Sequence, residues 1–539
     1  MNGLVEDSRS SSWKKNSRTD SNMLNSSDLS DRDADVHFVV PESVQQFLSY
    51  FRQKFREGNV SEVHTLYETS FNRYSERYFK TTSWPNPEIA AKYVDNDEVF
   101  LLFYKELYYR HIYSRLQPTL AQRVEAWDNY CDLFNFILND GIVDFDLPPS
   151  WLWDITDEFI YQFETWCHYR NRLKNKTEEE LAYLKDNEHI WNVNFLLQYL
   201  HAMVNKSNIC PWLLNGNEPV GSSDPDDDDF DYSTIPVYRF LGYFSIIGLL
   251  RVHCLLGDYK LALMVLQPLD FDDNTALFTR VTACYISLYY YMTFAFLMLR
   301  RYEDAVRVLG STLLHIGRIK QHHTRSYQYE QIHKRTDQML ALLAISLVFS
   351  SQNVDESVNS MLREKFGDKM TRMRQGEESV FEELFIYACP KFVSPCSPDY
   401  DRPMDRHMEA SYLQTKTFMR EVRQRLAVPE VKSFLSLYTS IELCKLAQFM
   451  ETTEEIFRSF LLCFKHKTFV FCGSPGQAPA EGSFVCCAPV SFFVDNDVVR
   501  VMDTKTESKF GEYFLQHIGK LQEFIQILEQ KKKSSTSTE

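Results

Sequence analysis

The chain has 539 residues, of which 44% are hydrophobic and 14% aromatic, enough for two or three domains with a large buried core. Its net charge of −16 argues against a general binder of phosphate backbones, because that affinity depends on clustered Lys and Arg. With 17 Gly and 19 Pro, it has too few turn residues for a sandwich or barrel of many tight turns. We therefore expect a mainly α-helical fold.

The first 35 residues are rich in Ser, Asp, Asn and Arg and contain almost no apolar side chains. Such a segment cannot bury enough surface to offset the entropy of ordering, so we expect a disordered tail over residues 1–35. It also lacks the apolar core of a signal peptide. The 12 Cys show no paired spacing, which indicates reduced thiols in the cytoplasm.

Residues 36–214 follow a helical pattern and form a predicted N-terminal all-helical region. Asn96 is the expected cap of a helix that reads DEVFLLFYKELYYRHIY. Pro148 and Pro149 break the chain, and Ser150 is the expected cap of the next helix. Residues 215–234 predict an acidic linker, because the run Asp226–Asp229 repels itself; the turn Gly and distal Glu of a calcium loop are missing.

Helical repeats are predicted over residues 235–428. The segments GDYKLALMVL at 257–266 and RRYEDAVRVL at 300–309 are similar. The pairs that match across a constant interval are Tyr259 and Tyr302, Ala262 and Ala305, and Leu266 and Leu309. A small Ala at a helix crossing, with a Tyr at the turn, allows paired helices to pack closely, so we expect a tetratricopeptide-like solenoid.

An uncharged segment at 281–299 is near the length that a bilayer requires. Three consecutive Tyr, at 289–291, would then lie at mid-membrane. Aromatic residues of this type prefer the membrane interface, so we interpret the segment as a buried repeat helix and expect no membrane contact.

The sequence pattern of residues 429–505 predicts a winged helix. A first short helix is followed by IELCKLAQFM, for which Ser440 is the expected cap, and Thr452 with Glu455 has the spacing of a capping box for a third helix. That third helix is apolar on more than one side, and its basic residues lie only at its end, at 465–467. This pattern favours packing against protein over reading of DNA bases.

The wing is predicted as a β-hairpin, with VSFFV at 490–494 and VVRVM at 498–502 joined by turn residues at 495–497. The preceding Gly- and Pro-rich segment 472–489 is expected to be a loop. We predict that the edge of the winged helix binds a partner, through Val490, Phe492, Val494, Val499 and Val501.

Residues 506–530 predict one long helix, followed by a disordered tail at 531–539. Its apolar residues recur at alternating spacings of four and three: Phe514, Ile518, Leu521, Ile525 and Leu528. This is the seam of a helix bundle, and we predict that it binds partner helices. The alternative is that the stripe packs on its own domain.

A helical-repeat body, a winged helix and a terminal bundling helix together resemble the PCI domain, here at about 305–517. The resemblance is to one particular family that contains this domain, and not only to the domain in general. NDEVFLLFYKELYYRHIY at 96–113, WLWDITDEFIYQF at 151–163 and FFVDNDVVRVMDTK at 492–505 resemble the subunit L family of eukaryotic translation initiation factor three. The similarity extends from about residue 37 to 530.

The resemblance implies a non-catalytic scaffold subunit, without a cofactor, of a complex that binds the small (40S) ribosomal subunit and promotes initiation and messenger RNA recruitment. It implies neighbours among the other subunits, especially E and K, and a cytoplasmic location. Contact with RNA is then indirect or weak. A PCI scaffold of another complex, of the proteasome lid or signalosome type, is the alternative.

The sequence bears on three further classes of function. The chain lacks GxxxxGK, GxGxxG, HExxH and GxSxG motifs, which argues against an enzyme. A zinc site would use Cys463, His466, Cys472 and Cys486, whose spacing fits no standard finger. Direct RNA binding, by a winged-helix protein of this kind, would draw on the one local basic patch, at residues 318–325, for which a solvated loop between helices is the favoured explanation.

Overall fold

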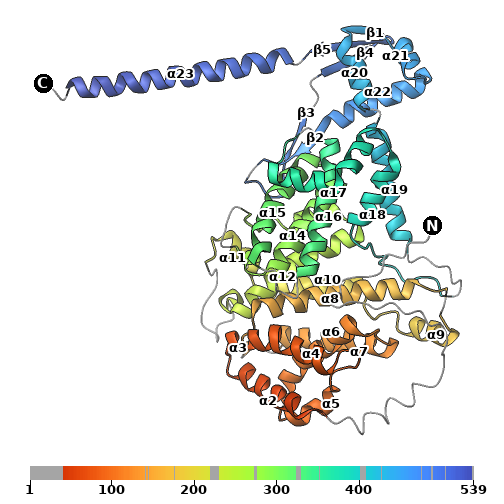
Figure 1. The fold of residues 1–539 in the computed structure, drawn as a ribbon, viewed down its shortest axis with the longest axis vertical. Coiled ribbons are helices and arrows are strands. Elements are labelled where there is room, and N and C mark those ends of the chain that lie inside the picture. Colours follow the sequence, from red (N-terminus) through yellow and green to blue (C-terminus); the bar gives the residue numbers. More distant parts are fainter. Residues whose placement is uncertain are drawn as a thin grey trace. The chain divides into compact units, whose positions relative to one another are not determined.

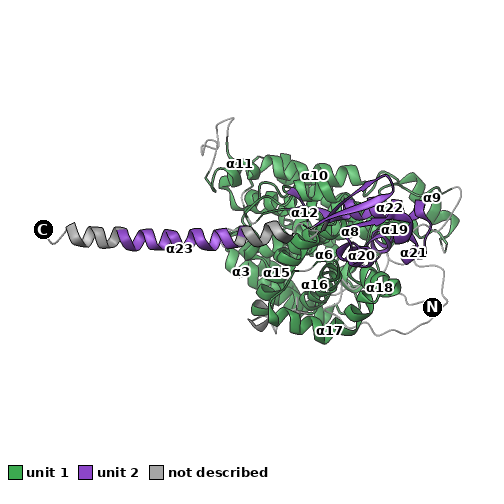
Figure 2. Ribbon diagram, turned by 90° about the horizontal axis from the view of Figure 1, so that it is seen from above, with its two compact units in different colours: residues 1–417, 473–482 green, residues 418–472, 483–539 purple. Residues whose placement is uncertain are grey.

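The computed structural model describes residues 40–536, apart from 140, 144, 175, 219–229, 272–275, 323–328, 351, 401–407, 427, 475, 487–489 and 504. The chain divides into two compact units (Figure 2). Unit 1 comprises residues 1–417 and 473–482, and unit 2 comprises residues 418–472 and 483–539. The expected tails and the run Asp226–Asp229 lie outside the described residues, and the expected domain limits remain predictions.

Unit 1 is built from helices (Figure 1). Its N-terminal part contains α2 (Glu42–Arg56), α3 (Val60–Thr65), η2 (Leu66–Phe71), α4 (Asn72–Tyr78), α5 (Pro87–Ala90), η3 (Ala91–Tyr93), α6 (Glu98–Arg115), α7 (Leu120–Asn139), α8 (Pro149–Asn171), α9 (Glu178–Asp186), α10 (Val193–Lys206) and α11 (Ile209–Leu214). Its second part contains η4 (Tyr232–Thr234), α12 (Pro236–Leu256), α13 (Tyr259–Met264), η5 (Leu277–Arg280), α14 (Thr282–Met298), α15 (Tyr302–His322), α16 (Tyr329–Phe349), α17 (Glu356–Arg374), α18 (Glu378–Ala388) and the first half of α19 (Glu409–Leu426), whose second half belongs to unit 2.

Two predicted helix caps are wrong by one or two residues. Asp97, not Asn96, caps α6, and its side chain accepts a hydrogen bond from the Phe100 N–H. Asp97 is buried, but hydrogen bonds from Arg56, Phe100 and Arg52 outweigh the cost of burial and lower its pKa to about 2. Helix α8 begins at Pro149, after Pro148, because a Pro at the first helical position has no N–H to satisfy.

The matched positions of the internal repeat are buried in both copies. Tyr259, Ala262 and Leu266 are buried around α13, and their counterparts are buried along α15. Helix α12 packs against α8, α10 and α14, and α15 packs against α14 and α16, which gives a stack of neighbouring helices. The mainly helical, repeat-type fold predicted from the sequence is confirmed, although α13 is a short helix and α15 a long one.

The apolar segment at 281–299 forms α14, and its central residues Tyr290 and Tyr291 are buried inside unit 1. Among the described helices, α12 alone is long and apolar enough to cross a membrane. In this helix, 89% of the apolar window is buried within the protein, as in the core helix of a folded domain.

Gly242 on α12 provides the first test of this packing. A Cβ built there would lie 1.9 Å from Ser207 Oγ and 3.3 Å from Ile209 Cγ2. We predict that Gly242→Ala lowers the stability of unit 1 by about 1–3 kcal/mol through overpacking. Urea unfolding followed by Trp fluorescence measures this, since every Trp of the chain belongs to unit 1. The control Gly317→Ala, with open space around the added carbon on α15, should not destabilise.

Unit 2 contains α20 (Val428–Leu437), β1 (Ser440–Glu442), α21 (Leu443–Phe449), α22 (Glu454–Thr468), β2 (Phe469–Cys472), β3 (Ser483–Cys486), β4 (Val490–Asp495), β5 (Val498–Asp503) and α23 (Lys505–Thr536). Three strands form an antiparallel sheet in the order β1-β5-β4, and β2 and β3 form a separate two-stranded ribbon. Three helices and this sheet give the predicted winged helix.

The predicted wing is confirmed as the hairpin β4–β5. Asn496 and Asp497 form its two-residue turn, and both have positive φ, at 44° and 66°. Two positive φ angles match the right-handed twist of the flanking strands, and Asn and Asp tolerate them.

Three predictions for unit 2 are wrong in detail. Ser440 is not a helix cap, because residues 440–442 pair with β5 as a strand. Thr453, not Thr452, precedes α22, and no capping box forms. The segment 472–489 is not only a loop, since Ser483–Cys486 forms β3 and pairs with β2.

Candidate partner-binding surfaces

The core of the winged helix decides which of its side chains face outward. Eleven buried residues form it: Val431, Leu435, Ile441, Leu443, Leu446, Ala447, Phe457, Leu461, Phe464, Phe492 and Val499. The ring of Phe492 stacks on that of Phe464, with 5.7 Å between ring centroids. One face of the sheet β1-β5-β4 is therefore covered by α20, α21 and α22.

The predicted edge residues occupy different environments. The side chains of Phe492 and Val499 are in the core, and Val501 is half-buried against it. Val494 is 39% exposed near the end of β4, and the side chain of Val490 lies outside the described residues. Val499 and Val501 are on β5, the central strand of the sheet, so they do not lie at an edge.

Strand β4 is an edge strand. In the part of the chain that the structure describes, it pairs only with β5, so one row of main-chain N–H and C=O groups has no strand beside it. Phe493 and Met502, which face away from the core, are 44% and 58% exposed. The sequence reasoning missed these two, although the period-two alternation around Phe492 and Val501 could have identified them.

Helix α23 exposes the whole predicted stripe. Each of its five members is at least half exposed: Phe514 60%, Ile518 50%, Leu521 63%, Ile525 54% and Leu528 55%. The stripe thus packs on nothing among the described residues. Its residue spacing is confirmed as helical, since α23 runs from Lys505 to Thr536.

The exposed apolar surface of α23 is wider than the predicted seam. Tyr513 and Phe524 are also at least half exposed and lie on one flank of the stripe, and Leu515, which is 70% exposed, lies on the other flank. At 3.6 residues per turn these apolar residues cover roughly half of the circumference, while Gln516, Glu523 and Gln526 lie on the other half. A two-stranded coiled coil buries a narrower stripe, so this surface suits more than one neighbouring helix.

A network of charges is buried where α6, α8 and α12 meet. Glu106 is fully buried and pairs with Arg110 on the same helix, and Asp154 lies 3.6 Å from Arg110. On α12, Arg251 is 1% exposed and binds Asp157 at 2.5 Å and Glu164 at 3.0 Å, both on α8. Carboxylates outnumber Arg side chains here, and burial raises the pKa of Asp154 to about 6 and that of Glu158 to about 8.

This cluster predicts a pH dependence of stability. The folded state keeps a proton on Glu158 up to about pH 8, while the unfolded chain releases it near the ordinary value of 4.5. The unfolded state then binds fewer protons, so stability falls as pH rises through this window. We predict that Glu158→Gln reduces the loss of stability between pH 5 and pH 8 by about 1–3 kcal/mol. Urea midpoints by Trp fluorescence, determined between pH 5 and pH 8, measure this change. An unchanged dependence of stability on pH in Glu158→Gln, or an equal change in the control Glu179→Gln at an exposed position, would contradict the prediction.

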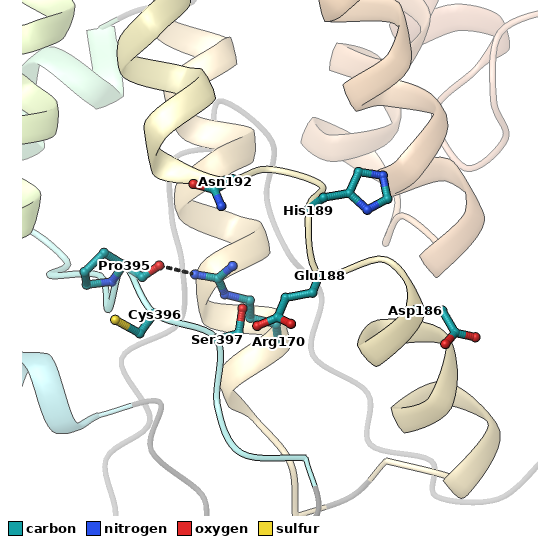
Figure 3. A pocket seen from close by; sticks show the side chains of 8 residues that line it. All are labelled: Arg170, Asp186, Glu188, His189, Asn192, Pro395, Cys396 and Ser397. Atoms are coloured by element: carbon teal, nitrogen blue, oxygen red, sulfur yellow. Dashed lines mark hydrogen bonds between the residues drawn. The ribbon is translucent and has the colours of Figure 1, made fainter.

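A surface pocket of about 640 Å³ lies in unit 1 (Figure 3). It is lined by Arg170, Asp186, Glu188, His189, Asn192, Pro395, Cys396 and Ser397. Arg170 donates hydrogen bonds to the Pro395 and Ser394 carbonyls, at 3.0 and 3.3 Å, which fixes the returning chain against α8. Between described residues, no hydrogen bond joins the Cys396 thiol to His189, so the pocket lacks an assembled nucleophile–base pair.

The residues considered for zinc do not converge. Within the described ranges, no group of three or more His, Cys, Asp or Glu side chains could hold a metal ion. Cys463 and His466 belong to α22, and Cys472 and Cys486 to the two-stranded ribbon. The side chains of the basic patch at 319–325 lie outside the described residues.

The fold and these surfaces define a class of protein: a helical-repeat body, a winged helix and a long terminal helix make up the PCI-domain architecture. Residues 122–521 match the family model described as RNA polymerase I-associated factor PAF67. Eukaryotic translation initiation factor 3 subunit L of Nematostella vectensis is 45% identical over 499 residues, which cover 91% of this chain and 94% of that protein.

The proteins of the same name from Gallus gallus and Homo sapiens are each 43% identical over 515 residues, and 91% of each chain is covered. The chain belongs to the family of eukaryotic translation initiation factor 3 subunit L. The resemblance inferred from the sequence is thereby confirmed, and this homology supports a subunit of the translation initiation factor 3 complex.

Proposed function

We propose that this chain is a non-catalytic scaffold subunit that holds neighbouring subunits of the initiation factor 3 complex together. The exposed apolar half of α23 carries the proposal. Its five stripe residues are 50–63% exposed, and a contiguous exposed apolar surface of this kind is typical of a site that another protein covers. The wide apolar face favours a bundle of several helices, and the sequence resemblance nominates subunits E and K as neighbours.

The winged helix supplies a second contact in this proposal. The main chain of β4 offers an edge to which a strand of a neighbour can add, with Val490, Phe492 and Val494 setting the register. Phe492 acts there through its backbone, since its ring is in the core. Phe493 and Met502 are the side chains that such a neighbour would cover.

We further propose that the chain meets the small ribosomal subunit through the complex, in the cytoplasm, with RNA contact indirect or weak. The net charge of −16 supports an indirect contact. The experiment is affinity capture of the tagged full-length chain from eukaryotic cells, followed by sucrose-gradient sedimentation. Initiation factor 3 subunits should co-purify and sediment with the 40S fraction; capture of lid or signalosome subunits instead would contradict the proposal.

A further inference from the structure

The segment Gly473–Gly482 belongs to unit 1, although the strands on both sides of it, β2 and β3, belong to unit 2. In unit 1 it meets the beginning of α15. Pro479 is buried there, while most of the segment around it is exposed or half-buried. The sequence predicted only a loop at this place and gave no sign of these contacts with α15.

Arg301 and Asp304 hold the main chain of this segment. Arg301 is 4% exposed and donates hydrogen bonds to the Pro479 carbonyl and, at 3.2 Å, to the Glu481 carbonyl. Asp304, 1% exposed, accepts the Gly473 N–H at 3.0 Å. These are charge-assisted bonds to backbone atoms, which are stronger than bonds between neutral groups.

The two charged side chains are themselves fixed. Arg301 Nε donates to Asp304 at 2.7 Å, and its guanidinium lies 4.6 Å from the centroid of the Phe296 ring. Arg307 donates to Asp304 at 2.6 Å and to the Gly473 carbonyl at 3.1 Å. The binding site formed by Arg301, Asp304 and Arg307 is therefore pre-organised. It binds both ends of the segment, at Gly473 and at Glu481.

Gly473 is needed for the close approach. A Cβ at this position would lie 2.7 Å from Arg301 Nη2 and 3.3 Å from the Glu481 carbonyl oxygen. Any larger residue would push Arg301 away from the carbonyls that it binds. The contact thus depends on the shape of the segment as well as on the charges of α15.

The ribbon that carries this segment has little packing of its own. It has two strands, and Phe469 and Phe484 are 49% and 73% exposed. Phe484 meets Phe471 across the strands, with 5.2 Å between ring centroids. A two-stranded ribbon of this kind is only marginally stable in water, so the bonds at its tip contribute much of what keeps it paired.

We propose that Arg301 and Asp304 form a latch for the main chain of Gly473–Gly482, and that the closed latch keeps β2 and β3 paired. Opening of the latch leaves both units folded and melts the ribbon. This conformational device is independent of the scaffold role proposed above.

The test is hydrogen exchange of the full-length chain, with the amides of Phe469–Cys472 and Ser483–Cys486 as the readout. Gly473→Val opens the latch from the segment side, with the sequence of α15 unchanged, and should raise exchange in the two strands roughly tenfold or more. The matched control Ser474→Val adds the same side chain at an exposed neighbouring position and should leave exchange unchanged.

Asp304→Asn tests the latch from the other side, because it removes the charge that holds Arg301 and Arg307 and nearly keeps the volume of the side chain. It should raise exchange in the same two strands, while the amides at the centres of α12 and α14, the buried helices of unit 1, keep their protection. Unchanged ribbon exchange in Gly473→Val and Asp304→Asn, or an equal rise in Ser474→Val, would overturn the proposal.

Discussion

Replacing Ile518, Leu521 and Ile525 with Asp releases the chain from the initiation factor 3 complex and leaves unit 1 folded. Each substitution places a charge where the scaffold model buries an apolar side chain. Burial of one such side chain contributes about 1.5–3 kcal/mol, so three replacements weaken binding by roughly a thousandfold or more. Co-purification of partner subunits with tagged variants from cells measures the effect.

The matched control places the same three charges on the other side of α23. Gln516→Asp, Gly519→Asp and Gln526→Asp change the net charge of α23 by the same amount, but these positions lie on the far side from the stripe, and the space beside Gly519 is open. The control variant should keep its partners. Equal loss of partners from both triple variants, or from neither, would contradict the assignment of the apolar face.

Arg251→Met lowers the stability of unit 1 by about 3–5 kcal/mol, because it removes the cation from two carboxylates that are held against α12. The Met side chain retains most of the volume, so the loss reports the charge and not a cavity. Urea unfolding by Trp fluorescence measures it. A loss below about 1 kcal/mol would show that the buried ion pairs contribute no more than exposed ones.

Two further variants separate this effect from a general loss of charge. The exposed pair Arg363–Glu356, with 69% and 75% side-chain exposure, makes Arg363→Met a control that should cost about 0–1 kcal/mol. Adding Glu164→Gln to Arg251→Met should recover part of the loss, since it removes a negative charge that the first substitution leaves behind.

The sequence was most informative where a long pattern repeats. The spacing of Phe514 to Leu528 identified α23, and the matched Tyr and Ala of the two repeat segments identified buried positions of the solenoid. Such patterns follow from the geometry of the helix itself and need no knowledge of the neighbours. The family resemblance was recognised in the same way, because whole helical segments are similar to those of the family.

The sequence was less informative where the tertiary structure decides. Residues 440–442 form a strand only because β5 lies beside them, and β3 needs β2 in the same way. The choice of Asp97 over Asn96 as a cap depends on the backbone of one residue. The burial of Phe492 and Val499 depends on which face of the sheet the helices cover, which alternation alone does not reveal.

The buried ion pairs of α12 were missed, although the chain carried a sign of them. Arg251 follows the uncharged stretch at 240–250 of this helix. A charge at such a position needs a buried partner, but the sequence does not say that Asp157 and Glu164 supply it.

Photo-cross-linking within the assembled complex tests the central claim, that the apolar face of α23 binds other subunits. A photoreactive phenylalanine analogue is placed at Ile525 on the apolar face, and at Glu523 on the opposite face as the control. We predict that the probe at position 525 cross-links to another subunit, while the probe at position 523 does so much less. Cross-links from position 525 only to residues of this same chain would contradict it, because the stripe would then pack on its own domain.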